Sequence, residues 1–336
     1  NLDTIGQMSC NPAIGGLAKG NLVRELDALG GLMARVADAS TLQFRVLNTR
    51  KGLAVRSSRA QVDIDHYPRC MKSALQAIEG LEIFEGEVVD LDLDPGVRGL
   101  WLATGEKIDT RAVILTAGTF LAARMHRGSV STPGGRVGDG SSDRLSERLR
   151  GAGLRMARLK TGTTPRLSAQ SVDWERLEVQ EDSEGRFSFS PPTSTLRRIA
   201  CHLAYTNLQT HEIIQENVTR SAVYGGGITG AGPRYCPSIE DKIVRFPERD
   251  RHLLFLEPEG LTTNEFYPNG ISTSLPFDIQ LAALRTMPPA PPAAIIASSS
   301  SSASHFATAV ATAGRSSGTL RTFIAAARWF RKLQCR

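Results

Sequence analysis

The alternation of apolar and polar residues predicts a mixed α/β chain. Apolar positions at helical spacing predict three amphipathic helices, over residues 17–29, 64–78 and 141–154. Between the second and third helices, short apolar runs joined by turn-forming residues predict an antiparallel meander. Its strands are expected over 81–84, 87–93, 99–103 and 107–108.

The apolar run Ala112–Thr119 follows this meander and predicts a buried parallel strand that ends in a turn of small residues. Gly118 in that turn would let a ligand approach the backbone closely. A meander followed by such a strand is typical of the later FAD signature of flavoproteins with two dinucleotide-binding folds. An ordinary buried strand and turn is equally compatible, and the Gly-x-Gly-x-x-Gly fingerprint that should precede the signature is not in the sequence.

The composition changes twice along the chain. After Arg158 it becomes rich in Gly, Pro, Thr and Asn, which suggests a second domain or an insertion, with 173–192 as a polar, exposed excursion. After Met287 it is dominated by Pro, Ala and Ser and can bury too little surface to fold, so we expect a disordered basic tail. The predicted division is 1–157, 158–287 and 288–336.

Composition excludes several classes of protein. The 336 residues carry a net charge of +6, but the seven cations after Asp278 account for this excess and leave 33 basic and 34 acidic residues before them. Overall charge therefore does not indicate nucleic-acid binding. Five widely spaced cysteines favour a reducing compartment over a disulfide framework. The histidines lack metal-ligand spacing, so we expect no metal site. No apolar run approaches the roughly 20 residues that a membrane-spanning helix needs, so we expect no membrane span.

Two cysteines lie in loops rich in glycine and proline. Cys10 precedes the first predicted helix, and Cys236 lies between Arg234 and Lys242. A helix N-terminus and nearby cations favour the thiolate form of cysteine. Because neither residue has a Cys-x-x-Cys partner, the pattern indicates nucleophilic attack more than disulfide exchange. The alternative is that both are small buried hydrophobes.

Two cationic stretches could contact phosphate groups of a cofactor or of RNA. An ordinary solvated surface explains them equally well. The candidate residues are Arg45, Arg50, Lys51 and Arg56 in the first stretch, and Lys160 and Arg166 in the second.

Several longer motifs resemble the MnmG (GidA) family, almost continuously from Asn1 to about Met287. The matching segments are Asp3–Gly16, Glu25–Gly31, Gly232–Lys242, Phe255–Gly260 and Tyr267–Pro276.

The resemblance implies a glutathione-reductase-like FAD-binding fold, here without its first strand-turn-helix, with an inserted α/β domain associated with NADH. Cys10 and Cys236 match the two cysteines that the family requires for function. Val88 and Ser142 match FAD contacts, and Gly118 belongs to the FAD signature described above. The expected dinucleotide-binding residues are Gly232, Pro233, Arg234, Tyr235 and Lys242.

The resemblance also implies an activity, which is FAD-dependent formation of 5-carboxymethylaminomethyluridine at the wobble position of tRNA. NADH would be the reductant and methylene-tetrahydrofolate the one-carbon donor. An MnmE-type GTPase would be the partner of a homodimeric enzyme, in the cytoplasm of a bacterium or in a mitochondrion. The alternatives are a TrmFO-like, folate-dependent tRNA uridine methyltransferase, a non-catalytic remnant that binds tRNA or the partner without flavin, and a thiol-disulfide flavoenzyme.

Overall fold

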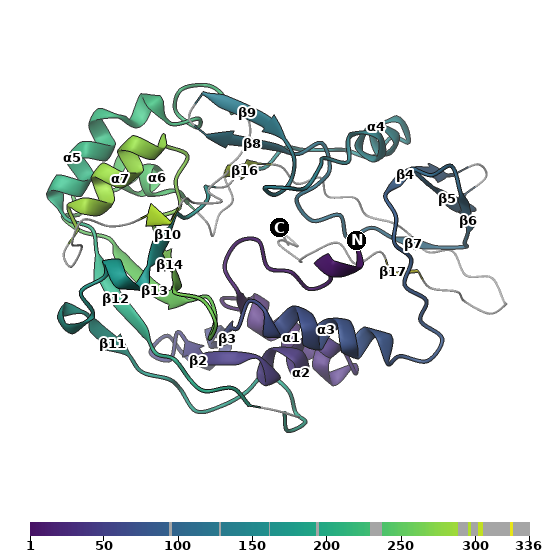
Figure 1. Cartoon of the computed structure of the whole chain (residues 1–336), viewed down its shortest axis with the longest axis horizontal. Coiled ribbons are helices and arrows are strands. Elements are labelled where there is room, and N and C mark those ends of the chain that lie inside the picture. The colour runs from purple at the N-terminus through teal and green to yellow at the C-terminus, as the bar shows by residue number, and fades with distance from the viewer. Residues whose placement is uncertain are drawn as a thin grey trace.

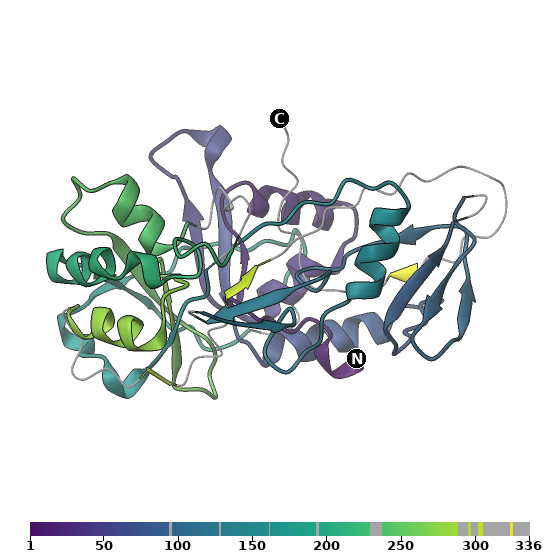
Figure 2. The same ribbon diagram turned by 90° about the horizontal axis from the view of Figure 1, so that it is seen from above.

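The computed structural model describes residues 1–93, 96–127, 129–160, 162–192, 195–228 and 237–287, together with three short strands nearer the C-terminus. Figures 1 and 2 place a six-stranded sheet with its helices at one end of the molecule and a small meander at the other. The N-terminal layer lies between them. Its position brings it into contact with the large sheet, where the candidate site forms.

The N-terminal layer is an antiparallel sheet of order β1-β3-β2, covered by three helices. Apolar side chains that alternate along β3 pack under the helices, and Phe44, Ala60 and Val62 are buried there. The strands are β1 (Ala13–Gly15), β2 (Thr41–Leu47) and β3 (Ser57–Val62), and the helices are α1 (Lys19–Ala28), α2 (Leu32–Ala39) and α3 (His66–Gln76).

The predicted meander is confirmed as an antiparallel sheet of order β4-β5-β6, with helix α4 packed against it. Its elements are β4 (Val88–Asp92), β5 (Gly99–Leu102), β6 (Lys107–Asp109) and α4 (Asp143–Gly151). The predicted strand over 81–84 is wrong. That segment has no strand neighbour among the described residues, and Phe84 is 50% exposed.

The predicted buried parallel strand over 112–119 is parallel but much shorter and less buried than expected. Only β7 (Val113–Ile114) is a strand, and it pairs in parallel with β17 (Phe323–Ile324). Ile114 is 51% exposed because no layer of described residues covers that side of the strand. A third small sheet lies nearby, with the order β16-β8-β9, formed by β8 (Arg124–Arg127), β9 (Val130–Pro133) and β16 (Ser302–Ser304).

The largest sheet has the order β11-β12-β13-β14-β10-β15, and its described pairings are antiparallel. Its strands are β10 (Arg166–Ser168), β11 (Glu178–Gln180), β12 (Cys201–Tyr205), β13 (Leu253–Pro258), β14 (Glu265–Asn269) and β15 (Ile295–Ile296). Three helices pack beside it around Ile214, Ile243 and Leu254 (Figure 1). They are α5 (Leu208–Glu216), α6 (Ile239–Arg245) and α7 (Phe277–Arg285).

Five single-turn 3₁₀ helices occur among the described residues. They cover Leu2–Thr4, Leu53–Val55, Ala169–Ser171, Trp174–Arg176 and Val218–Arg220. None of the helices in the described ranges combines the length and the apolar character that crossing a bilayer requires.

Residues 173–192, predicted to be an exposed excursion, are mostly exposed, but they cross the N-terminal layer and bury one aromatic residue in it. Phe187 is fully buried and packs edge-on against Phe44, with ring centroids 5.5 Å apart. The carboxylate of Asp38 accepts hydrogen bonds from the backbone N–H groups of Phe187 and Ser188, at 2.8 and 2.7 Å. Burial raises the pKa of Asp38, and these two hydrogen bonds oppose the rise. One aromatic anchor therefore ties an otherwise polar segment to the core.

The predicted division into 1–157 and 158–287 stays a prediction. Phe187, from the second of these parts, packs in the core of the N-terminal layer. The predicted disordered tail lies outside the described residues apart from β15, β16 and β17.

Replacement of Phe187 tests how much this aromatic anchor contributes to the free energy of unfolding. We expect Phe187→Ala to lower the free energy of unfolding by about 3 kcal/mol, because it leaves a cavity beside Phe44. The matched control is Phe189→Ala, since Phe189 is 62% exposed and only stacks under Arg24. That loss should be below about 1 kcal/mol. Urea denaturation measures both, and equal losses would contradict the assigned role of Phe187.

Candidate active site around Cys10

Cys10 lies in the loop before β1, at the junction of the N-terminal layer and the large sheet. Its side chain is half-buried, and its Sγ is 3.3 Å from the hydroxyl oxygen of Tyr267 on β14. The hydroxyl of Thr164 donates a hydrogen bond to the same tyrosine oxygen at 3.0 Å. The thiol is therefore ordered by a polar contact and remains partly open to the surroundings.

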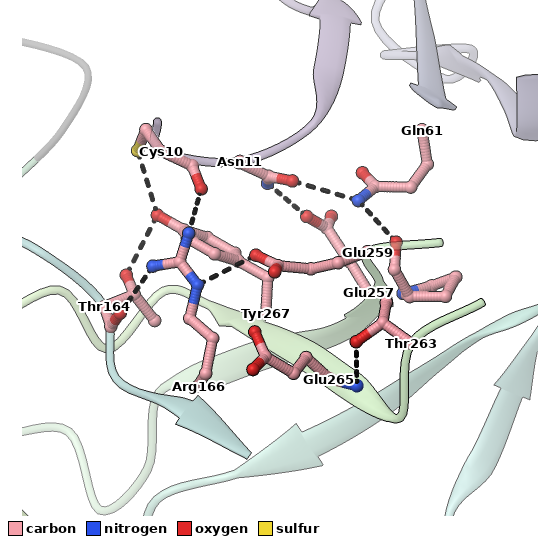
Figure 3. Close-up of polar contacts among 11 residues, drawn as sticks. Cys10, Asn11, Gln61, Thr164, Arg166, Glu257, Glu259, Thr263, Glu265 and Tyr267 are labelled. Carbon is pink, nitrogen blue, oxygen red and sulfur yellow. Dashed lines mark hydrogen bonds and ion pairs between the residues drawn. The ribbon is translucent and has the colours of Figure 1, made fainter. Parts of the chain in front are cut away.

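The guanidinium group of Arg166, at the start of β10, holds this arrangement together (Figure 3). Its Nε donates to Glu259 Oε1 at 2.8 Å, and its Nη1 donates to the carbonyl of Thr164 at 2.9 Å. Its Nη2 donates to the carbonyl of Cys10. The guanidinium carbon also lies 4.8 Å from the centroid of the Tyr267 ring. A planar group with fixed donors can make all these contacts at once, which a lysine could not.

Arg166 supplies a permanent positive charge beside Cys10. Burial opposes that charge, but the nearby carboxylate of Glu259, with contributions from Tyr267 and Cys10, outweighs burial and raises the pKa of Arg166. The side chains of Arg166 and Glu259 are only 6% and 4% exposed, so solvent screens their attraction little. A fixed cation in such a place stabilises negative charge that develops nearby during a reaction.

A second polar network fixes the residue that follows Cys10. Asn11 donates to Glu257 Oε2 at 2.5 Å and accepts from Gln61 at 3.0 Å. Arg59, on β3, forms an ion pair with the same Glu257 oxygen at 2.7 Å. Asn269 donates to the other oxygen of Glu257 at 3.3 Å. The loop is thus held on both sides of Cys10, which preorganises the thiol.

Cys236 lies outside the described residues, as do the predicted dinucleotide-binding residues Gly232–Tyr235. The residue that follows Cys236 is described. The hydroxyl of Ser272 donates to the carbonyl of Pro237 at 3.2 Å, and Thr273 exchanges backbone hydrogen bonds with Thr163 at 3.0 and 3.3 Å. Thr163 directly precedes the threonine that donates to the tyrosine hydroxyl beside Cys10. A continuous path of contacts therefore joins Pro237 to Cys10.

Lys242, another predicted dinucleotide-binding residue, lies on α6. Its Nζ donates to the carbonyl of Gly270 at 2.6 Å. Gly270 ends the turn after β14, so this contact ties the helix behind Cys236 to the strand of the active-site tyrosine.

The predicted FAD contacts border a single apolar cluster between the meander and α4. Val88 and Ala117 pack against this cluster, and Gly118 follows with a positive φ of 58°. Ser142 is the N-cap residue of α4, and its side chain makes no capping hydrogen bond. An apolar wall, a glycine turn and the positive end of a helix suit a dinucleotide, so the residues present fit FAD.

The predicted phosphate-binding cations lie in two different environments. Arg50, Lys51 and Arg56 are exposed on the hairpin between β2 and β3, which projects from the molecule in Figure 2. The half-buried Arg45 donates to the carbonyl of Glu181 at 2.6 Å.

The second cationic stretch is less open. Lys160 is half-buried, and Arg166 is buried against Glu259. A contact between Arg166 and substrate phosphate would require this ion pair to open.

Of the side chains around Cys10, Arg166 was predicted from the sequence, as a phosphate-binding candidate, while its neighbours on and after β13 and β14 were not. Tyr267, Glu257 and Glu259 lie in the motifs that carry the family resemblance, but nothing in their spacing points to Cys10. Each reaches the site only because β13 and β14 pair. In the described part of the chain, no group of three or more His, Cys, Asp or Glu residues is placed to hold a metal ion.

Comparisons with known proteins match most of this chain. The family model for glucose inhibited division protein A (GIDA) matches residues 1–306. A relative from Pelobacter propionicus, named tRNA uridine 5-carboxymethylaminomethyl modification enzyme MnmG, is 53% identical over 290 residues, which are 85% of this chain and 46% of the relative.

Crystal structures of Aquifex aeolicus GidA show the same fold. The form I structure has a TM-score of 0.81 at 46% identity and covers 90% of this chain and 52% of its own. The form II structure has a TM-score of 0.79 at 43% identity, with coverage of 90% and 49%. These matches confirm the predicted α/β FAD-binding fold, and the chain spans about half the length of the relatives it matches. On the strength of the family model and these identities, the chain belongs to the GidA (MnmG) family.

Proposed function

We propose that this chain forms part of an FAD-dependent enzyme that builds 5-carboxymethylaminomethyluridine at the wobble position of tRNA. The observation that carries the proposal is the thiol of Cys10, half-buried and held by Tyr267 beside the cation of Arg166. The Pelobacter relative bears the name of this activity, which supports the choice of substrate.

The chemistry explains why thiols are needed. C5 of uracil is a weak nucleophile. When a cysteine thiolate adds to C6, its lone pair forms the S–C6 bond, and the C5–C6 π electrons move into an enolate. C5 then attacks an electrophilic one-carbon unit, loses its proton to a base, and the S–C6 electron pair returns to sulfur. One of Cys10 and Cys236 would add to the base, while the other assists the transfer of a proton or of the carbon.

The surroundings of Cys10 suit such a step. Negative charge passes from the sulfur to the uracil ring and back, and Arg166 offers a fixed cation that needs no reorganisation during the reaction. The hydrogen bond that Asn11 donates to Glu257 and the one that Arg166 donates to the Cys10 carbonyl hold the loop in place. The path from Pro237 to Thr164 supports a shared pocket for the two cysteines.

The cofactors follow from the family. Val88, Gly118 and Ser142 would hold FAD, and Lys242 with the Gly232–Tyr235 segment would bind NADH. When bound, FAD supplies redox chemistry between NADH and the one-carbon unit of methylene-tetrahydrofolate. An MnmE-type GTPase partner, a homodimer and a cytoplasmic or mitochondrial location complete the proposal.

The β2–β3 hairpin is the proposed contact to tRNA. Its cations are solvent-exposed, and Leu53 at its tip is 78% exposed. Exposed arginine and lysine side chains bind phosphates and release counterions, which gives affinity without sequence preference.

A second candidate is a non-catalytic protein that binds tRNA or the partner, and the exposed cations of the β2–β3 hairpin would serve it equally well. The two candidates differ in whether the chain retains flavin and modifies tRNA.

Replacement of Cys10 tests the proposed chemistry. We expect Cys10→Ser to reduce tRNA modification to background, because a hydroxyl is a far weaker nucleophile than a thiolate, while flavin retention stays unchanged. Mass spectrometry of digested tRNA measures the product and separates it from 5-methyluridine.

The matched control is Cys70→Ser, since Cys70 lies on α3 beside His66 and away from Tyr267. Wild-type rates in Cys10→Ser would refute the proposed role. If the unsubstituted chain neither binds flavin nor modifies tRNA, the result would instead favour the second, non-catalytic candidate.

The hairpin makes a separate prediction. We expect Arg50→Ala combined with Lys51→Ala to weaken tRNA binding and to reduce the slope of log affinity against log salt by about 1 per lost phosphate contact. Arg111→Ala removes an exposed cation beside β7 and serves as the control. Filter binding over a range of salt concentrations measures the slope, and an unchanged slope in the double variant would contradict the proposed tRNA contact.

A further inference from the structure

The hydroxyl of Tyr267 lies between two polar groups and has a single proton to give. Thr164 Oγ1 donates to the tyrosine oxygen at 3.0 Å, and Cys10 Sγ lies 3.3 Å from the same oxygen. Since the tyrosine oxygen already accepts from Thr164, its own O–H group is available to donate to the sulfur. Such a hydrogen bond is stronger to an anionic sulfur than to a neutral thiol.

We propose that Tyr267 is a catalytic hydrogen-bond donor to the thiolate of Cys10, and that Thr164 is a positioning residue that acts through Tyr267. The inference rests on the proposed function, because it assumes that the thiolate of Cys10 takes part in the reaction. It adds two residues to the chemistry for which the family resemblance gave no role.

The burial of both residues supports this assignment. Tyr267 is 4% exposed and Thr164 is 1% exposed, so bulk water does not compete for their hydroxyls. The carbonyl of Thr164 is bound by Arg166, which also stacks on the tyrosine ring. The hydroxyl group therefore lies beside the sulfur before any substrate arrives, and no reorganisation is needed for it to donate.

The charged groups near the sulfur lie on or next to β3, β10, β13 and β14. Arg166 on β10 is paired with Glu259, which follows β13, and Arg59 on β3 is paired with Glu257 on β13. Burial, together with the neighbouring carboxylate of Glu265 on β14, raises the pKa of Glu259, and Arg166 opposes this rise. Within the described part of the chain, the hydrogen bond recorded for the sulfur is the one from β14, through Tyr267.

Tyr267 keeps its proton throughout the reaction. When the thiolate adds to C6 of uracil, the sulfur lone pair becomes the S–C6 bond and the O–H···S contact weakens. When the base is released, that electron pair returns to the sulfur and the hydrogen bond forms again. The tyrosine therefore stabilises the nucleophile before addition and the leaving group afterwards, with no change in its own protonation.

Alkylation of Cys10 by iodoacetamide tests the proposal without flavin or tRNA. The rate is measured against pH in the purified full chain, by mass spectrometry of the Cys10 peptide. We expect Tyr267→Phe, which keeps the ring and its stacking on Arg166, to slow alkylation near neutral pH about tenfold. The pH of half-maximal rate should move upward. Thr164→Val should shift the profile in the same direction by less, and Thr164→Ser, which keeps the hydroxyl, should restore it.

The matched control is Tyr205→Phe, because Tyr205 on β12 also lies under an arginine, with Arg251 4.5 Å from its ring centroid. That variant should keep the wild-type profile. An unchanged profile in a folded Tyr267→Phe protein overturns the proposal. If Tyr267→Phe does not fold, the Thr164 pair decides it, and wild-type behaviour of Thr164→Val overturns it.

The alkylation test of Tyr267 and the activity test of Cys10→Ser can fail independently of each other. A shifted alkylation profile together with full tRNA modification by Cys10→Ser would keep Tyr267 as the donor to the thiolate and reject the role of that thiolate in modification. An unshifted profile together with an inactive Cys10→Ser protein would do the reverse.

Discussion

The buried guanidinium of Arg166 is the interaction on which the site depends. It connects the loop of Cys10, the start of β10, the carboxylate after β13 and the aromatic ring on β14. Burying an arginine is costly, and here the carboxylate of Glu259 and two backbone carbonyls offset that cost. Removing either member of such a buried pair leaves an unmatched charge and typically costs about 3–5 kcal/mol. The N-terminal layer and the large sheet are therefore joined by a contact that tolerates little change.

This junction also explains how one site can be built from distant segments. Cys10 and Arg166 are 156 residues apart, and Cys10 and Tyr267 are 257 apart. The ion pair of Arg59 and Glu257 adds a second connection between the same two layers. The crossing segment that buries Phe187 adds a third. Three separate contacts therefore join the two layers, and Arg166 and Tyr267 make the direct contacts to Cys10.

Most elements that depend on local patterns of apolar and turn-forming residues were predicted correctly from the sequence. The three amphipathic helices and the meander lie close to α1, α3, α4 and β4–β6, because their periodicity and turn residues act over a few positions. The cysteine motifs and the family were also readable, since they depend on contiguous residues. Features that depend on remote partners were not. The run 112–119 looked buried because its composition is apolar, yet exposure depends on what lies beside it, and Ile114 is half-exposed. Phe187 lay in a polar stretch whose burial is decided by Phe44 and Asp38.

Arg166 is the clearest example of this limit. In the sequence it belongs to a stretch of cations, threonines and a glycine that suits an anion on the surface. Its actual partner, Glu259, is 93 residues away and joins it because β10 pairs with β14, which in turn pairs with β13. Charge identity was visible in the sequence, but burial and pairing required the sheet order.

The most direct test of the account is chemical cross-linking of Cys10 to Cys236 in a chain whose other three cysteines are replaced by serine. If Arg166 holds the Cys10 loop against the large sheet, and the two cysteines share a pocket as proposed, a short bis-maleimide reagent should join the two thiols within one chain. Arg166→Met should then abolish the cross-link in protein that remains folded. A chain with Arg166 intact that gives no internal cross-link, although each thiol reacts singly, would contradict the account.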